Sequence, residues 1–158
     1  NIIKNLAKGG VMNTIVLKVK KLDNNKSLPE YATSGAAGMD LTAGIDEPMV
    51  FKPLERKLVP TGIIIELPHG YEAQVRPRSG MSIKHGITLV NCVGTIDEDY
   101  RGELKVPVIN LSQEEYTINP GDRIAQMIVA PVVKAEIEVV ETVGATNRAS
   151  GGFGSTGY

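Results

Sequence analysis

Short runs in which apolar and polar residues alternate occur along most of the chain. The first, residues 14–22, has apolar side chains at every second position, which is typical of a half-buried strand. Further short strands are predicted over residues 36–41, 48–51, 56–65, 71–75, 87–93, 104–111, 116–118, 123–131 and 135–140. Turns rich in glycine, proline and asparagine separate them. About ten short strands of this kind predict an all-β, antiparallel sandwich or jelly roll.

Only one helical segment is predicted. Ser79 to Lys84 has the length of a single helical turn, with Ser79 at its N-cap and Gly86 ending it. No glycine-rich turn joins a long parallel strand to a long helix, which argues against a Rossmann or P-loop fold. The chain is therefore predicted to be mostly β, with one short helical segment.

The pattern also divides the chain into three parts. Residues 14–143 carry the alternation and are predicted to form one jelly-roll domain. Residues 144–158 are rich in glycine, serine and threonine, which is typical of a flexible C-terminal arm, although a tail without function has the same composition. Residues 1–13 are interpreted as an N-terminal extension or a remnant of cloning and are left out of the fold prediction.

Composition narrows the classes of protein. The 158 residues include 42% hydrophobic residues, enough for a single core without disulfides. The net charge is only −1 and the basic residues are scattered, which argues against binding a nucleic-acid polymer or an acidic membrane. No run reaches the roughly 20 apolar residues of a membrane helix, and residues 1–13 lack an apolar signal core. We therefore expect a cytoplasmic protein.

The single cysteine, Cys92, has no partner in the chain and lies in a strand-like run. This predicts a buried, reduced thiol. A nucleophilic or metal-binding role is the weaker alternative, because no further cysteine or nearby histidine accompanies it.

Residues 91–105 carry the densest group of chemically active side chains. Apolar residues lead into a turn that contains Asp97, Glu98 and Asp99, and a second strand follows. The segment is predicted to be a hairpin with three carboxylates at its tip. Acid-rich turns are common, and by itself this one is more readily interpreted as a solvated turn.

Other segments change that interpretation. Arg-Ser-Gly at residues 78–80 and Gly-Asp-Arg-Ile-Ala-Gln at 121–126 supply donors for an anion, and the glycine-rich arm supplies a flap. Each segment alone is an ordinary loop. Together they provide an acid, anion donors and a cover for a bound molecule.

Five segments in this order resemble the five motifs of the trimeric deoxyuridine triphosphatase (dUTPase) family. They are Ala37 to Leu41, Pro77 to Gly80, Gly94 to Gly102, Gly121 to Gln126, and Arg148 with residues 151–157. The resemblance implies a dUTPase-like jelly roll, a homotrimer with sites shared between subunits, and hydrolysis of dUTP to dUMP and pyrophosphate with Mg²⁺. Such an enzyme limits uracil incorporation into DNA and supplies dUMP for thymidylate synthesis.

The resemblance also implies roles for the acidic segment. Asp97 is expected to be the general base that deprotonates the water attacking the α-phosphorus, a role that suits a carboxylate kept ionised by nearby cations. Glu98 and Asp99 are expected to be turn-forming, solvated acids. The uracil edge is expected to bind backbone groups of the segment and one amide side chain; these residues are Asn91, Gly94, Thr95 and Ile96.

Sugar and phosphate contacts are implied in the same way. Tyr100 is expected to pack against the deoxyribose and exclude a 2′-hydroxyl, although a tyrosine beside a turn is often merely packed. Lys105 is expected to lie beside the nucleotide. The expected phosphate donors are Arg78, Ser79, Gly80 and Gln126.

Magnesium is expected to be held mainly by the substrate's phosphates, without a dedicated protein cage. Asp40 is interpreted either as the partner of Arg123 in a structural ion pair or as a group that reaches the metal through water.

In the arm, Arg148 is expected to bind the γ-phosphate and Phe153 to stack on uracil, with donors from Gly154, Ser155 and Thr156. Similar proteins usually have glycine after the arginine, where this chain has Ala149. If that position needs a positive φ, alanine costs on the order of 1 kcal/mol there.

Two alternatives remain open. A dCTP deaminase-type enzyme on the same fold would activate water at the pyrimidine ring, and the segment from Asp97 to Tyr100 argues against it. A non-catalytic, nucleotide-binding regulatory trimer is the other, and the presence of competent residues at every expected catalytic position argues against that one.

Overall fold

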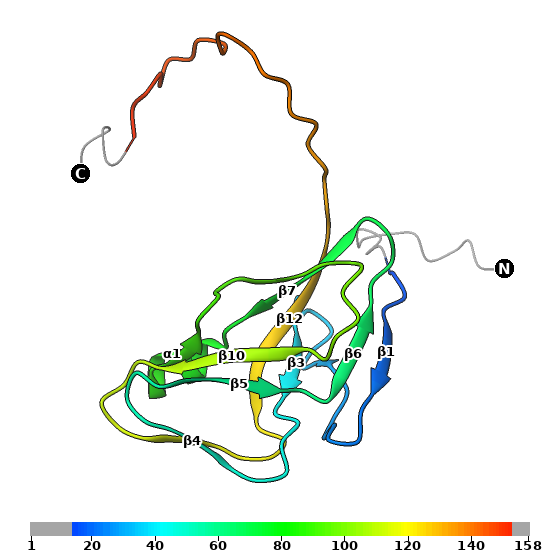
Figure 1. Cartoon of the computed structure of the whole chain (residues 1–158), viewed down its shortest axis with the longest axis vertical. Coiled ribbons are helices and arrows are strands. Elements are labelled where there is room, and N and C mark those ends of the chain that lie inside the picture. Colours follow the sequence, from blue (N-terminus) through cyan, green and yellow to red (C-terminus); the bar gives the residue numbers. More distant parts are fainter. Residues whose placement is uncertain (1–13, 153–158) are drawn as a thin grey trace, which may run out of the picture.

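A computed structural model of the chain describes residues 14–152 (Figure 1). Within them lie twelve strands and one helix, α1 (Ser79–His85). The strands are β1 (Lys18–Lys21), β2 (Glu30–Tyr31), β3 (Met39–Thr42), β4 (Met49–Phe51), β5 (Arg56–Pro60), β6 (Ile63–Glu66), β7 (Tyr71–Arg76), β8 (Ile87–Leu89), β9 (Gly94–Ile96), β10 (Lys105–Asn110), β11 (Tyr116–Ile118) and β12 (Arg123–Pro131). The predicted all-β, jelly-roll-like fold is confirmed.

The strands form two main sheets and two small ribbons, and every pairing is antiparallel. The larger sheet has the order β2-β3-β12-β7-β9, and the smaller has the order β5-β10-β8. The ribbons are β1-β6 and β11-β4. The longest strand, β12, lies in the middle of the larger sheet, where it pairs with β3 on one side and β7 on the other.

The core lies between the sheets and takes the apolar positions that the alternation marked. In β10, Val106 and Val108 are buried, whereas Pro107 and Ile109 are only half-buried. Phe51, Met127 and Leu41 are among the largest fully buried side chains. The alternation was informative because successive side chains of a strand point to opposite faces.

Helix α1 confirms the single predicted helical turn but not its cap. The residue at the N-cap is Arg78, with an extended backbone, and it makes no side-chain capping hydrogen bond. Ser79 is the first helical residue, so its predicted capping role is wrong. Gly86 ends the helix in the left-handed conformation (φ 67°), as predicted. No helix in the described part of the chain is long and apolar enough to cross a membrane.

The predicted hairpin over residues 91–105 is wrong. Strand β9, before the acidic residues, pairs with β7 in the larger sheet, whereas β10, after them, pairs with β5 and β8 in the smaller sheet. Leu104, the last residue before β10, is buried, and its N–H donates to the carbonyl of Ile63 in β6, 2.9 Å away. The chain has therefore left the larger sheet before β10 begins. The acidic segment is therefore a crossover between sheets, and we call residues 97–104 the crossover loop.

Three predicted strands differ clearly from those observed, and one of them, 87–93, ends already at Leu89. The run 56–65 is divided into β5 and β6 by a bend at Thr61 and Gly62, where Gly62 has φ 70° and lies against the backbone of Asn25. Residues 135–140 form no strand. Figure 1 shows the chain leaving the end of β12 and extending away from the body. Ile137 and Val139 are 88% and 93% exposed there, because no strand within residues 14–152 pairs with this segment.

Cys92 is exposed, so the predicted buried thiol is wrong. The reason is local, because β8 ends at Leu89 and Cys92 lies in the loop before β9. The division of the chain at residue 143 stays a prediction, and residues 1–13 lie outside the described part.

Among the residues that the structure describes, Asn110 is the one buried residue whose side chain bonds several separate backbone segments. Its amide nitrogen donates to the carbonyls of Phe51 (2.9 Å) and Glu114 (2.7 Å). Its oxygen accepts from the N–H (2.9 Å) and hydroxyl (2.8 Å) of Ser112. Because a buried polar group costs free energy when it loses its partner, this amide joins β4 and the β10–β11 turn in one network.

Replacing Asn110 with alanine should therefore lower the free energy of unfolding by about 2–4 kcal/mol, since several buried groups lose partners at once. Urea denaturation measures the change. Asn147→Ala is the matched control, because that side chain is exposed and makes no hydrogen bond within the described residues. It should cost no more than about 0.5 kcal/mol. Similar losses for the two variants would contradict the assigned role of Asn110.

Candidate active site

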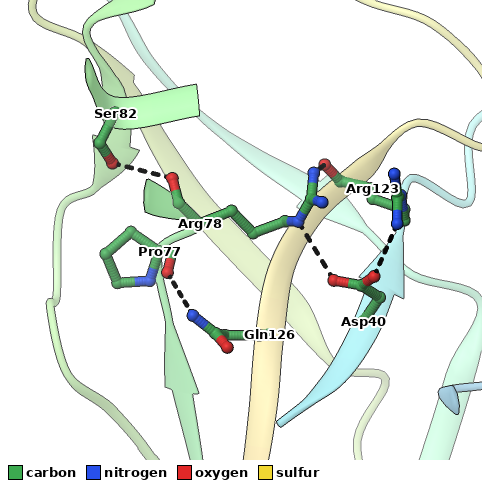
Figure 2. A network of polar contacts seen from close by, with 6 residues as sticks. All are labelled: Asp40, Pro77, Arg78, Ser82, Arg123 and Gln126. Carbon is green, nitrogen blue, oxygen red and sulfur yellow. Dashed lines mark hydrogen bonds and ion pairs between the residues drawn. The ribbon is translucent and has the colours of Figure 1, made fainter. Parts of the chain in front are cut away.

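One cluster of charged side chains surrounds Asp40 on the larger sheet (Figure 2). Arg78 donates from Nε to Oδ1 of Asp40 (3.1 Å), and Arg123 donates from Nη1 to Oδ2 (3.1 Å). Arg78 also donates from Nη1 to the Arg123 carbonyl (3.1 Å). The structural ion pair between Asp40 and Arg123 is thus present, and Arg78 makes it a three-residue network.

Strand pairing brings these residues together. Asp40 of β3 is in register with Gln126 of β12, and Gln126 is in register with Arg76 of β7. Arg78 follows β7 by two residues and so lies near the same row. The Gln126 amide donates to the Pro77 carbonyl (3.0 Å), which ties the segment before α1 to β12.

A pocket of about 360 Å³ opens beside this network. Its polar lining consists of Asp40, Arg78, Ser79, Arg123 and Gln126, together with Gly80. Two guanidinium groups and one carboxylate leave one positive charge in excess, which suits an anion. All four expected phosphate-binding residues therefore line one pocket, which we call the anion pocket.

Glycine at position 38 lets the backbone lie close to the Gln126 side chain in its observed position. A Cβ atom there would lie 2.8 Å from Oε1 of Gln126, closer than real side chains allow. The absence of a side chain lets the segment before β3 approach the glutamine at the rim of the anion pocket.

The acidic residues line a second pocket, of about 610 Å³, which we call the acidic pocket. Its polar lining consists of His69, Glu72, Thr95, Asp97, Glu98, Asp99 and Lys134. Asp97 is exposed, and within residues 14–152 its carboxylate makes no hydrogen bond. Its oxygens are therefore free to accept a proton or a hydrogen bond.

Glu98 was predicted to be a solvated turn acid; it is still 38% exposed, but its carboxylate also makes two contacts that the prediction did not include. One carboxylate oxygen accepts from the backbone N–H of Gly70 (2.6 Å), and the other contacts Nδ1 of His69 (2.9 Å). The Gly70 hydrogen bond first, and the His69 contact second, hold the pKa of Glu98 below its usual range. No sequence signal indicated this contact, because His69 lies 29 residues away.

Tyr100 is folded back on its own loop. Its hydroxyl donates to the Glu103 carbonyl (3.1 Å), and it lies so close to Gly102 that a Cβ there would meet the hydroxyl oxygen. Its backbone N–H donates to the Asp97 carbonyl (3.2 Å). Tyr100 and Asp97 are thus held in one turn. The exposed Lys105 begins β10, next to this turn.

The residues expected to recognise the base lie around β9. Gly94 is buried and pairs with Val75, and a Cβ on it would lie 3.0 Å from the amide nitrogen of Asn91. Thr95 pairs with Gln74 and is exposed, and Ile96 pairs with Ala73. Asn91 therefore lies beside β9, and β9 pairs directly with β7.

The described part of the arm contains one ordered turn. Arg148 donates from Nε to the Gly151 carbonyl (2.8 Å), and the Gly151 N–H donates back to the Arg148 carbonyl (2.9 Å). Ala149 has φ 45°, so this position does adopt the left-handed conformation that glycine favours. Phe153, Gly154, Ser155 and Thr156 lie outside the described residues.

A single chain does not bring the two pockets together. Gln126 is in register with Arg76, whereas Ile96, next to Asp97, is in register with Ala73. The offset of three residues is roughly 10 Å along the strands, and two strand spacings add roughly 10 Å across the sheet. Asp97, the expected general base, is therefore well separated from the expected phosphate donors within one copy.

One polar row was missed by the sequence analysis. Along the outer face of β7, Gln74 donates to Glu72 (2.7 Å) and Arg76 donates to Gln74. The Nε of Arg76 is buried and has no partner within residues 14–152. The signal was available, because polar residues occupy every second position from 72 to 76. The row runs from the acidic pocket toward Gln126.

These features define a jelly-roll-like protein with an arginine-lined anion pocket and a separate acidic pocket. The sequence model of the dUTPase family matches residues 24–157. The chain belongs to the dUTPase family.

Individual relatives agree. The chain is 59% identical over 143 residues to the deoxyuridine 5′-triphosphate nucleotidohydrolase of Finegoldia magna, covering 90% of this chain and 100% of the relative. It is 54% identical over 147 residues to that of Syntrophotalea carbinolica, covering 93% and 100%.

Solved structures show the same fold. The dUTPase of Staphylococcus bacteriophage 80alpha, solved with dUpNHpp, is 28% identical with a TM-score of 0.83, over 92% of this chain and 100% of that one. A variant of the dUTPase from phage phi11 of S. aureus, described with a structural Mg(II) ion, is 25% identical with a TM-score of 0.75, over 83% and 100%.

Replacing Asp40 with asparagine should lower the free energy of unfolding by about 1–2 kcal/mol, because two guanidinium groups lose their shared counter-charge and Arg123 is partly solvated already. Thermal or urea denaturation measures the loss. Asp46→Asn is the control, since the Asp46 side chain is 79% exposed and pairs only with Lys26. Its effect should be below about 0.5 kcal/mol. Equal losses of unfolding free energy in the two variants would show that Asp40 stabilises the fold no more than an exposed charge does.

Proposed function

We propose that this chain hydrolyses dUTP to dUMP and pyrophosphate. The observation that carries the proposal is the anion pocket around Arg78 and Asp40, found in a member of the dUTPase family that also has Asp97 exposed in the acidic pocket. The names of the curated relatives and the phage structure solved with dUpNHpp support it. The reaction limits uracil incorporation into DNA and supplies dUMP for thymidylate synthesis.

We propose that the active enzyme is a homotrimer in which each site combines groups from different copies. The separation of Asp97 from Gln126 within one chain supports this, because a single nucleotide triphosphate must contact both the phosphate donors and the base. The exposed apolar side chains at residues 133–143 offer surface for such an assembly.

In the proposed reaction, Asp97 accepts a proton from a water molecule while that water attacks the α-phosphorus. The bond between the α-phosphorus and the bridging oxygen breaks, and pyrophosphate leaves with the electron pair. The exposed position of Asp97, without a competing hydrogen bond within residues 14–152, supports this role.

Recognition of the nucleoside is assigned to the residues around β9 and the crossover loop. Backbone groups of Gly94, Thr95 and Ile96, with the Asn91 amide, bind the uracil edge. A site built from such donors and acceptors leaves groups unpaired when cytosine enters, which can discriminate by about 10⁴-fold or more. Tyr100 covers the sugar and excludes a 2′-hydroxyl, and Lys105 lies beside the nucleotide.

The phosphates bind in the anion pocket. The guanidinium of Arg78 uses Nε and Nη1 for Asp40 and Arg123, which leaves its other N–H groups for phosphate oxygens. The Ser79 hydroxyl, the Gly80 amide and the second N–H of Gln126 complete the donors. Arg148 from the arm binds the γ-phosphate, and Phe153, Gly154, Ser155 and Thr156 close over the nucleotide.

Magnesium fits this site as an ion held mainly by substrate phosphates. No group of three or more His, Cys, Asp and Glu side chains among the described residues is arranged to hold a metal. Both oxygens of Asp40 already accept from guanidinium groups, so Asp40 would contact a bound Mg²⁺ through water, using its remaining lone pairs. When bound, Mg²⁺ neutralises charge on the departing pyrophosphate.

Purified protein incubated with dUTP, dCTP, UTP or dTTP and Mg²⁺ tests the reaction. Pyrophosphate should be released from dUTP at a rate far above that from the other three, because the base site and Tyr100 each reject one class of competitor. Pyrophosphate and ammonia are both measured. Ammonia from dCTP would instead identify a deaminase, and binding without either product would identify a regulatory protein.

Mixed trimers test the shared site. Asp97→Asn should lower kcat by about 10²–10⁴-fold while nucleotide binding persists, because it removes only the base. Arg78→Met should lower activity by weakening phosphate binding. When the two variants are co-expressed, about a quarter of the sites should regain both wild-type residues if each site draws Asp97 and Arg78 from different copies of a symmetric trimer.

The matched control replaces the Arg78→Met chain by one that carries both substitutions, so that no site contains a wild-type Asp97. This mixture should stay inactive. Recovery in neither mixture would show that Asp97 and Arg78 of one site come from the same copy.

A further inference from the structure

The crossover loop carries Asp97 between two sheets and so lacks the strand pairing that would otherwise hold it. On one side, β9 ends at Ile96, and on the other, β10 begins at Lys105. A residue in such a loop keeps a fixed position only if side chains or turns tie the loop to the body. Reactive groups need that fixity, since a displacement of about 1 Å can cost roughly 100-fold in rate.

Glu98, the neighbour of Asp97, ties this end of the loop to the body, whereas Glu103 and Leu104 tie the other end. Its two carboxylate oxygens contact the Gly70 N–H (2.6 Å) and Nδ1 of His69 (2.9 Å) in the β6–β7 turn. That turn is itself anchored, because the Gly70 carbonyl accepts from the Val132 N–H (2.8 Å), just after β12. The carboxylate therefore connects the loop to the central strand of the larger sheet.

The loop is also tied to itself on the other side of Glu98. The Arg101 side chain donates from Nη1 to the carbonyls of Glu98 (2.6 Å) and Tyr100 (2.9 Å). The Tyr100 N–H donates to the Asp97 carbonyl (3.2 Å). Asp97 thus lies in a closed turn. Over residues 97–99, Glu98 is the only residue whose side chain forms hydrogen bonds with another part of the described chain.

We infer that Glu98 is a positioning residue that holds Asp97 in place through the Gly70 amide. The inference rests on the proposed role of Asp97 as the base. Glu98 acts through the loop and does not touch the reacting atoms. Asp99 lies in the same turn but makes no side-chain hydrogen bond within residues 14–152, so it does not share this role.

Glu98 stays ionised, and so keeps its contact with the Gly70 amide, at neutral and mildly acidic pH. Its pKa is lowered first by the Gly70 hydrogen bond, then by His69, with a further contribution from Lys134. A carboxyl group with a lowered folded-state pKa contributes its stabilisation above its ordinary pKa and loses it as the pH falls through the lowered value. The tie therefore holds at neutral and mildly acidic pH.

Two substitutions separate this role from simple loss of structure. Glu98→Ala removes both contacts, whereas Glu98→Gln keeps an oxygen that can accept from the Gly70 N–H. Glu47→Ala is the control, because that exposed glutamate makes no side-chain hydrogen bond within the described residues. The full-length trimer is used, with dUTP and Mg²⁺. Steady-state kcat and KM, the thermal midpoint and hydrogen exchange at the Gly70 amide are measured.

We expect Glu98→Ala to lower kcat about tenfold or more with KM changed less than about twofold, since positioning of the base is lost while the binding groups stay. The Gly70 amide should exchange faster in this variant. Glu98→Gln should restore most of kcat and of the Gly70 protection, and Glu47→Ala should match the wild type in both.

Wild-type kcat in Glu98→Ala would overturn the inference, as would equal losses in the alanine and glutamine variants despite restored Gly70 protection. A fall in the thermal midpoint that accounts for the whole loss of activity would also overturn it. Failure of the proposed base is a separate outcome. It would appear as an unchanged kcat in Asp97→Asn, whatever the Glu98 variants do.

Discussion

The pairing of β12 with both β3 and β7 is the constraint on which the candidate site depends. Because Gln126 faces Asp40 on one side and Arg76 on the other, three strands that are distant in sequence present polar groups in one row. Arg78 follows two residues later and closes on Asp40, so the guanidinium that should hold phosphate is oriented by an ion pair. A slip of one residue in this register would turn the row toward the core and abolish the pocket.

The second constraint is the crossover of residues 97–104 from one sheet to the other. A hairpin would have placed Asp97 in a short turn between two strands hydrogen-bonded to each other. The crossover leaves it in a loop instead, exposed to a pocket and free of competing hydrogen bonds within the described residues. Exposure makes a carboxylate available for chemistry, but it also removes the restraint that chemistry needs. Glu98 supplies that restraint from the neighbouring position.

The distribution of the two pockets explains why a homotrimer suits this fold. The anion pocket and Asp97 lie apart on the larger sheet, and in the proposed homotrimer a second copy brings them to one nucleotide. The arm departs from the end of β12 with exposed valines and an isoleucine, and its turn at Ala149 already holds the left-handed conformation despite the cost to alanine. The proposed assembly and closure thus use segments that are exposed within residues 14–152.

The amino-acid sequence alone determined the features that depend on near neighbours. Alternation located β11 and β12 at their observed bounds, and Gly86 marked the end of α1, because strand periodicity and glycine's left-handed backbone are local properties. The motifs also identified the anion pocket's residues. Only the tertiary structure decided that Asp97 lies apart from Arg78 and that Glu98 is tied to Gly70. Both depend on which strands pair and where a loop crosses, and such contacts join residues far apart in the chain.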